Sequence, residues 1–178
     1  MAFPTENHGE TALGDKLFHW GLRTYVMGVI NFTPDSFSGD GLIGNIESAV
    51  QRAFEFQEWG ADIIDVGGES TRPASLYTGY EPVSMKDELS RVIPLIGAIA
   101  DRLSIPISID TYKARVADEA LSAGASMVND VWGVQRDPDM ASIVSQRSVP
   151  VVITHNNESS RHGSDVVDGV IDDLRRVM

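Results

Sequence analysis

The chain has 178 residues, no cysteine, and 26 acidic residues against 14 lysines and arginines, which gives a formal charge of −12. Its 42% hydrophobic and 22% charged residues are typical of one folded domain, and the lack of cysteine excludes disulfides and thiolate chemistry. The acidic balance argues against a nucleic-acid partner, and without a membrane-length apolar run or the apolar core of a signal peptide we expect a cytoplasmic protein with no membrane partner.

Five short apolar runs, rich in β-branched residues, predict strands. They cover residues 25–30, 62–66, 105–109, 125–128 and 150–153. Nearly continuous apolar runs of this length are typical of strands buried on both faces of a parallel sheet. Residues 1–24 precede the first run, so we expect an N-terminal extension there and place the domain at residues 25–178.

Amphipathic stretches between these runs predict helices. Ser84, with Asp87 three residues later, is expected to cap one helix, and Gly124 is expected to end the next. Asp137 and Pro138 are expected to open a further helix, and a last helix begins near residue 164. The alternation of strands and helices predicts an α/β protein with right-handed crossovers.

Five strand–helix units are compatible with two architectures. A closed (β/α)8 TIM-type barrel needs eight units in about 250 residues, so this chain would hold about the first five. A complete five-stranded doubly wound sheet fits the same length. The spacing of the units alone does not separate the two.

Each apolar run ends in a polar residue that could take part in chemistry. The residues concerned are Asn31, Asp65, Asp110, Asn129 with Asp130, and His155. The carboxyl ends of parallel strands form the rim of the active site in α/β folds, although any one of these residues could simply cap the next helix. Because all five runs end this way, a shared cleft is the favoured interpretation.

Two loops after the first two strands carry candidate ligand-binding groups. Residues 31–41 are rich in glycine at their end and lack an apolar period, which is typical of a mobile lid. In residues 67–73, two glycines allow a close approach to a ligand, and Thr71 and Arg72 offer donors for a phosphate or carboxylate. A surface ion pair is the competing interpretation of Arg72.

A glycine pattern at residues 39–44 matches the G-x-G-x-x-G motif of dinucleotide-binding sites. That motif requires its first glycine directly after a strand, whereas eight residues separate Ile30 from Gly39. A nicotinamide-dependent oxidoreductase is therefore the weakest of the functions considered.

Four segments of the chain resemble, in order and spacing, the signature blocks of the dihydropteroate synthases. The first two are residues 27–38 (MGVINFTPDSFS) and 65–73 (DVGGESTRP), and both are long and specific. Residues 107–111 (ISIDT) and 128–131 (VNDV) are similar to the third and fourth blocks. The resemblance spans about residues 25–155 and implies a TIM-type barrel of which this chain holds the first five units, so we expect the chain to be incomplete and inactive alone.

The resemblance implies a transferase of folate biosynthesis. Such an enzyme condenses 6-hydroxymethyl-7,8-dihydropterin pyrophosphate with p-aminobenzoate to give dihydropteroate and pyrophosphate. The alternatives are a non-catalytic pterin-binding module and a barrel similar to the folate-dependent methyltransferases. Full-length members of the family are commonly homodimers, and a homodimer is the corresponding expectation here.

The resemblance also assigns roles to individual residues. Asn31 is the expected ligand of a Mg²⁺ cofactor. Asp35, Arg72 and Asp110 are the expected catalytic residues, the first two in loops that close over pyrophosphate. No role is carried to His155, because the family usually has Met-His where this chain has Thr154 and His155.

Two substrate pockets are implied as well. The pterin pocket is expected to contain Asp110, Asn129 and Val131. The pocket for p-aminobenzoate and for sulfonamides is expected to be lined by Phe37, Thr71 and Pro73.

Overall fold

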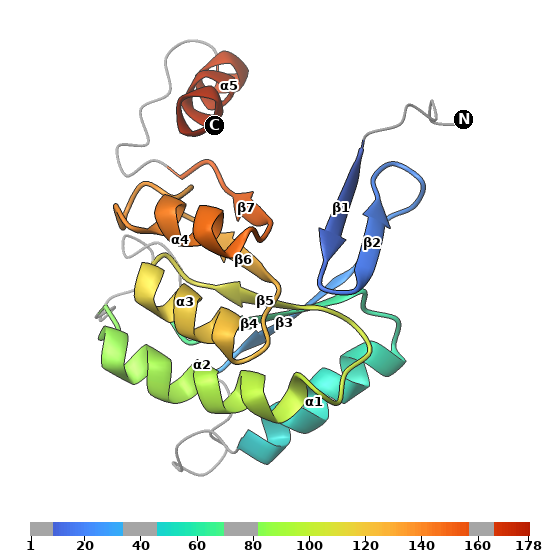
Figure 1. Ribbon diagram of the computed structural model, residues 1–178. Coiled ribbons are helices and arrows are strands. Elements are labelled where there is room, and N and C mark those ends of the chain that lie inside the picture. Colours follow the sequence, from blue (N-terminus) through green and yellow to red (C-terminus); the bar gives the residue numbers. More distant parts are fainter. Residues whose placement is uncertain (1–8, 34–45, 70–81, 157–165) are drawn as a thin grey trace.

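In the part of the chain that the structure describes, five parallel strands form a central sheet (Figure 1). The computed structural model describes residues 9–33, 46–69, 82–156 and 166–178. The sheet strands are β3 (Met27–Asn31), β4 (Ile63–Gly67), β5 (Ile107–Asp110), β6 (Met127–Asp130) and β7 (Val151–Ile153). The helices are α1 (Ile46–Glu58), α2 (Met85–Ile99), α3 (Ala114–Ser122), α4 (Met140–Arg147) and α5 (Val166–Val177). All five predicted strand–helix units are present.

The order of the strands separates the two architectures that spacing left open. The sheet runs β3-β4-β5-β6-β7, so each strand pairs with the next one along the chain. A doubly wound sheet instead reverses direction at a switch point and places later strands on the other side of the first. The sequential order belongs to a barrel wall, and the doubly wound alternative is wrong.

One face of the sheet holds the main core. Ile30, Val66, Ile109 and Val128 lie side by side in the strand register, and all are buried. They pack against the apolar stripes of the helices, and Figure 1 shows α1 to α4 along this side of the sheet. Full burial of each such side chain contributes about 1.5–3 kcal/mol.

Burial along the strands differs from the sequence-based prediction at the edge of the sheet. Every residue of β4 is buried, as expected for an internal strand. No residue of β7 is fully buried, and Val152 is 39% exposed. Val29 of β3 is 48% exposed as well. The prediction of strands buried on both faces is therefore wrong for β3 and β7, because these are the two outer strands of this sheet.

A hairpin that the sequence analysis does not predict covers the amino ends of the strands. Strands β1 (Glu10–Leu13) and β2 (Lys16–His19) pair antiparallel within the residues assigned to an N-terminal extension. Leu13 and Phe18 form a buried cluster with Ile63 and Met127, which lie at the starts of β4 and β6. This second core closes one end of the strands and leaves the carboxyl ends for chemistry.

The starts of two helices test the predicted caps at Ser84 and Asp137. The Ser84 hydroxyl accepts a hydrogen bond from the Asp87 backbone N–H at 3.1 Å, so Ser84 caps α2 as predicted. Helix α4 begins at Met140, three residues after Asp137, and Asp137 Oδ1 accepts the backbone N–H of Asp139 at 3.1 Å in the turn that leads into this helix. The other carboxylate oxygen of Asp137, Oδ2, accepts the backbone N–H of Ala114 at 2.8 Å at the start of α3. Asp137 therefore also serves a helix 23 residues earlier in the chain, a partner that a local motif cannot reveal.

The last helix forms as predicted, but its apolar side is not enclosed. No residue of α5 is buried, and Val166 and Val167 are 54% and 65% exposed. Among the described residues, no helix has the length and apolarity needed to cross a membrane.

Candidate functional site

Four adjacent strands end at the same level and bring their polar residues together. The strand register aligns Asn31 of β3 with Gly67 of β4, Gly67 with Asp110 of β5, and Asp110 with Asn129 of β6. A Cβ atom at Gly67 would lie 3.4 Å from both Asn31 Oδ1 and Asp110 Oδ2. The missing side chain at Gly67 therefore leaves a small space that these two polar side chains border.

A buried hydrogen bond links two further strand residues at this edge. Asn129 Nδ2 donates to Asp65 Oδ2 at 3.0 Å, and Asp65 is only 2% exposed. The other carboxylate oxygen of Asp65 and one carboxylate oxygen of Asp110, both Oδ1, are buried without a hydrogen-bond partner among the described residues. The Ser108 hydroxyl, next to Asp65, is buried without a partner as well. Buried polar atoms are nearly always paired in folded proteins, so these groups are available to the polar atoms of a ligand.

The site has an excess of negative charge, which shifts its protonation. Burial, together with the nearby carboxylates of Asp65 and Glu88, raises the pKa of Asp110 to about 7. Burial also raises the pKa of Asp65, and the neighbouring Ser108 and Asn129 side chains oppose that shift. Asp110 can therefore change its protonation state near neutral pH, which is a common property of functional carboxylates.

The residues that follow β6 have a structural role. Asp130 is fully buried, and its carboxylate accepts the backbone N–H groups of Trp132 at 2.8 Å and Val134 at 3.0 Å. Val131 is half-buried in the turn that these bonds stabilise. Of the two polar residues predicted at the end of this strand, Asn129 faces the site and Asp130 holds the turn.

A buried ionic cluster beside Asp110 escaped the sequence analysis. The Lys113 ammonium contacts both the Glu69 and the Glu88 carboxylates, and these two side chains are 3% and 1% exposed. Burial by itself lowers the pKa of Lys113, but the two carboxylates raise it above its ordinary value overall. The partners of Lys113 lie 44 and 25 residues away in the chain, so no local pattern could connect them.

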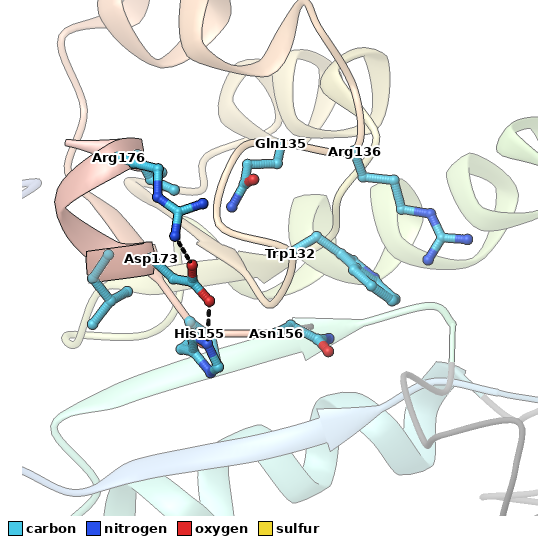
Figure 2. A pocket seen from close by; sticks show the side chains of 10 residues that line it. Trp132, Gln135, Arg136, His155, Asn156, Asp173 and Arg176 are labelled. Atoms are coloured by element: carbon cyan, nitrogen blue, oxygen red, sulfur yellow. Dashed lines mark hydrogen bonds and ion pairs between the residues drawn. The ribbon is translucent and has the colours of Figure 1, made fainter. Parts of the chain in front are cut away.

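A separate cavity of about 380 Å³ lies where β7 meets α5. Figure 2 shows His155, Asp173 and Arg176 on one side of it and Trp132 with Arg136 on the other. His155 Nε2 lies 2.9 Å from Asp173 Oδ2, so the predicted strand-end histidine joins this cavity and not the Asp65–Asn129 pair.

Several predicted site residues lie outside the described part of the chain. They are Asp35, Phe37, Thr71, Arg72 and Pro73, and the glycine pattern at residues 39–44 lies there as well. Their predicted roles therefore stay predictions, while Asn31, Asp110 and Asn129 are placed together at the strand ends.

The strand-end oxygens suit a hard divalent cation bound together with a substrate. Asn31 Oδ1 and Asp110 Oδ2 both border the space at Gly67, and Mg²⁺ prefers oxygen ligands. Among the described residues, no cluster of three His, Cys, Asp or Glu side chains could hold a metal ion by itself. This donor set fits Mg²⁺ in its common form, with one or two protein ligands and the remainder supplied by phosphates and water.

Comparison with known proteins places this geometry in a family. Residues 27–177 match the family of pterin binding enzymes. The dihydropteroate synthase of Clostridium beijerinckii is 48% identical over 163 residues, which cover 92% of this chain and 58% of that protein.

Solved structures agree in fold. A dihydropteroate synthase from Clostridium difficile, crystallised in the presence of pteroic acid, has a TM-score of 0.83 at 47% identity and is matched over 90% of this chain and 59% of that chain. The Xanthomonas albilineans enzyme with 4-aminobenzoic acid has a TM-score of 0.84 at 38% identity, over 94% of this chain and 59% of that chain. This chain therefore spans less than two thirds of each of these proteins, and its five strand–helix units are part of a TIM-type barrel. The chain belongs to the pterin-binding enzyme family.

Proposed function

We propose that this chain is part of a dihydropteroate synthase, which joins 6-hydroxymethyl-7,8-dihydropterin pyrophosphate to p-aminobenzoate and releases pyrophosphate. The observation that carries the proposal is the buried Asn129–Asp65 hydrogen bond beside Asp110, with one free acceptor oxygen on each carboxylate. Similarity to a synthase solved with 4-aminobenzoic acid and to one crystallised with pteroic acid supports the choice of substrates.

The pterin ring is the substrate part that this arrangement fits. A pterin presents adjacent N–H donors and a carbonyl acceptor on one edge. The free Oδ1 atoms of Asp65 and Asp110 can accept from such donors, and Asn129 adds an amide held in place by Asp65. Each N–H donor of the ring would then pair a carboxylate oxygen that has no partner in the free site. This gives specificity, because an analogue that lacks the donor leaves the buried carboxylate unpaired.

The charge of Asp110 supports the bond-breaking step. Cleavage of the carbon–oxygen bond to pyrophosphate leaves positive charge on the pterin, and the p-aminobenzoate nitrogen then attacks the same carbon and loses a proton. An ionised Asp110 would stabilise the cation, and a unit charge pair at 4 Å is worth about 4 kcal/mol at an effective dielectric of 20. A pKa of about 7 leaves a substantial carboxylate fraction at neutral pH.

We propose Asn31 as a protein ligand of Mg²⁺ in this reaction. When bound, the ion would offset charge on the departing pyrophosphate. The support is the position of Asn31 Oδ1 at the strand ends, next to Gly67 and Asp110. By the same resemblance, Asp35 and Arg72 would act on the pyrophosphate, and Phe37, Thr71 and Pro73 would contact p-aminobenzoate.

The test is an assay of the full-length gene product with both substrates. We expect pyrophosphate release that requires p-aminobenzoate and Mg²⁺ and that matches the dihydropteroate formed. Asp110→Asn should lower kcat/KM by at least about a hundredfold, since the charge interaction above is worth several kcal/mol.

A matched control tests whether the effect of Asp110→Asn is specific to the site. Asp118→Asn makes the same chemical change on the outer face of α3, where Asp118 pairs with Arg147, and should leave kcat/KM within about twofold. Pyrophosphate release that ignores p-aminobenzoate would refute the assignment. Pterin binding without any turnover would support the non-catalytic module instead.

A further inference from the structure

The hydrogen bond between Asn129 and Asp65 determines which polar atom of the Asn129 amide faces the site. A side-chain amide has two different ends, since its NH2 group only donates hydrogen bonds and its oxygen only accepts them. An ionised carboxylate only accepts, so the NH2 group of Asn129 is the end that bonds Asp65 Oδ2. The Oδ1 atom of Asn129 therefore points away from this bond.

The oxygen of this amide is open to a ligand. Asn129 is half-buried, and its Oδ1 atom accepts no hydrogen bond from the described residues. Unlike the Oδ1 atoms of Asp65 and Asp110, it is not fully enclosed by the protein. Because Asn129 is level with Asp110 in the strand register, its oxygen adds a third acceptor to the two carboxylate oxygens that lack a partner.

Asp65 supports the Asn129 amide from beneath the site. In β4, Asp65 lies two residues before Gly67, so the two residues share a face of the sheet and Asp65 is one level nearer the amino ends of the strands. Gly67 is level with Asp110, and Asp110 is level with Asn129. Asp65 is 2% exposed and lies in a strand whose residues are all buried, so its carboxylate has little freedom to move.

Stability alone does not account for a carboxylate at this position of an internal strand. Burial of a charge is costly, and an apolar residue is the ordinary choice in a strand that is buried on both faces. An amide or hydroxyl at position 65 would cost less, but it could donate to Asn129 Oδ1 as readily as it accepts from Nδ2. A carboxylate enforces one orientation of the Asn129 amide, because it has no donor to offer.

We propose that Asp65 is a positioning residue that sets the ligand preference of the site: it holds the NH2 group of Asn129, turns Oδ1 of Asn129 toward the substrate, and so selects a ring edge that carries N–H donors. This inference rests on the proposed function, which places a pterin ring at these strand ends. A pterin carries an amino group next to a ring N–H, whereas the related lumazine ring has a carbonyl oxygen in place of that amino group. The site should therefore bind a pterin and reject a lumazine.

Calorimetry with 6-hydroxymethylpterin and 6-hydroxymethyllumazine measures this preference as a ratio of two Kd values. The wild-type full-length gene product should bind the pterin at least about a hundredfold more tightly, because the lumazine places a carbonyl oxygen against acceptor oxygens. Asp65→Asn keeps the size of the side chain but lets the Asn129 amide turn over, so the ratio should fall at least about tenfold. Equal affinity of the wild-type protein for the two compounds would overturn the inference without any variant.

Two further variants separate positioning from a general loss of structure. Asp62 pairs with Arg23 and accepts the backbone N–H of Val26 at 2.8 Å just before the same strand, so Asp62→Asn makes the same chemical change far from Asn129 and should leave the ratio within about twofold. Combining Asp65→Asn with Asn129→Asp exchanges the two groups, so that an amide on β4 donates to a carboxylate on β6. That carboxylate again presents an acceptor to the ligand, and the ratio should return to within about threefold of the wild-type value.

The outcomes separate this inference from the proposed function. If Asp65→Asn weakens the binding of both compounds by the same factor, or if the double variant stays as unselective as Asp65→Asn, the positioning role is overturned. Either result in an enzyme whose pyrophosphate release requires p-aminobenzoate leaves the proposed function intact. A wild-type protein that prefers the pterin but shows no such release would refute the proposed reaction and support the inference about ligand preference.

Discussion

The side-chain amide of Asn129 on β6 bonds the carboxylate of Asp65 on β4, although β5 lies between these two strands in the sheet. Two residues that are 64 positions apart in the chain thus form one polar unit at the strand ends. The bond uses one oxygen of Asp65 and leaves the other without a partner among the described residues. The unit is therefore both fixed in position and ready to accept a hydrogen bond.

Removal of the Asn129 amide should weaken both the fold and ligand binding. Asn129→Ala leaves a buried carboxylate with neither oxygen paired, and an unsatisfied buried group costs about 1–3 kcal/mol. Urea unfolding should show that loss, and calorimetry with a pterin ligand should show at least about a tenfold weaker Kd. Ser126→Ala, which removes a hydroxyl near the amino end of the same strand, is the control and should leave the Kd unchanged. Wild-type affinity in Asn129→Ala would exclude Asn129 from the pterin pocket.

The raised pKa of Asp110 makes the stability of the protein depend on pH. The folded state holds this proton up to a pH of about 7, whereas an unfolded aspartate releases it near 3.8. Between these two values the folded state binds more protons, so the contribution of Asp110 to stability falls as the pH rises from about 4 to about 7.

Asp110→Asn removes this dependence and should stabilise the fold above pH 7. We expect a gain of about 1–3 kcal/mol at pH 8, the range for relief of a buried unpaired polar group, and no gain at pH 4. Urea titrations at the two pH values measure the difference in the free energy of unfolding between the variant and the wild type. The contributions of the other titrating groups largely cancel in this difference. A gain that is the same at pH 4 and pH 8 would contradict the assignment of a raised pKa to Asp110.

The same ionisation should appear in the pH dependence of activity. If the carboxylate form of Asp110 supports the reaction, kcat/KM for the pterin substrate rises with pH through about 7. Glu88→Gln removes a nearby negative charge that raises the pKa of Asp110, so the rising limb should move to lower pH in this variant. A limb that stays in place in Glu88→Gln would assign the titration to a different group.

The space at Gly67 predicts a variant that folds but loses activity. In Gly67→Ala the new methyl group would lie 3.4 Å from the oxygens of Asn31 and Asp110, close enough to displace them slightly. The free energy of unfolding should change by less than about 1 kcal/mol, because the contact is tight without being a clash. kcat/KM should fall at least about tenfold, since small displacements of positioned groups are costly in catalysis.

Gly97→Ala in α2 is the matched control for Gly67→Ala. A Cβ atom at Gly97 meets nothing within 4 Å, and alanine is favoured over glycine in a helix by up to about 1 kcal/mol. It should therefore be slightly more stable than wild type and fully active. Full activity in both variants would show that the space at Gly67 is not used.

The pattern of apolar runs is enough to predict the five strand–helix units and the strand-end residues, whereas the choice of a barrel depends on the resemblance to the family. Apolar runs such as residues 62–66 are local patterns, and Asn31, Asp110 and Asn129 lie in the last two residues of their strands. Parallel pairing then places these residues at one edge without further information.

Features that depend on distant partners could not be predicted in this way. The Asp137 carboxylate bonds the turn before α4, as a local rule predicts, but it also accepts a backbone N–H at the start of α3, which no local rule predicts. Lys113 is an ordinary surface residue by sequence, and only the folded chain places it between Glu69 and Glu88. The hairpin of β1 and β2 was missed because two four-residue strands carry too few side chains for a clear period.

The three tryptophans of the chain lie in three different environments, one of which is the core that the hairpin forms. Trp20 packs with Phe18 and Tyr25 in the core that closes the amino ends of the strands, and its ring N–H bonds the Thr11 hydroxyl at 2.8 Å. Trp132 lies after β6 beside the cavity in Figure 2, and Trp59 is 69% exposed at the end of α1. The intrinsic fluorescence can therefore be assigned to separate regions. A variant that keeps only Trp20 would report unfolding at the amino ends of the strands, and a variant that keeps only Trp132 would report changes at their carboxyl ends.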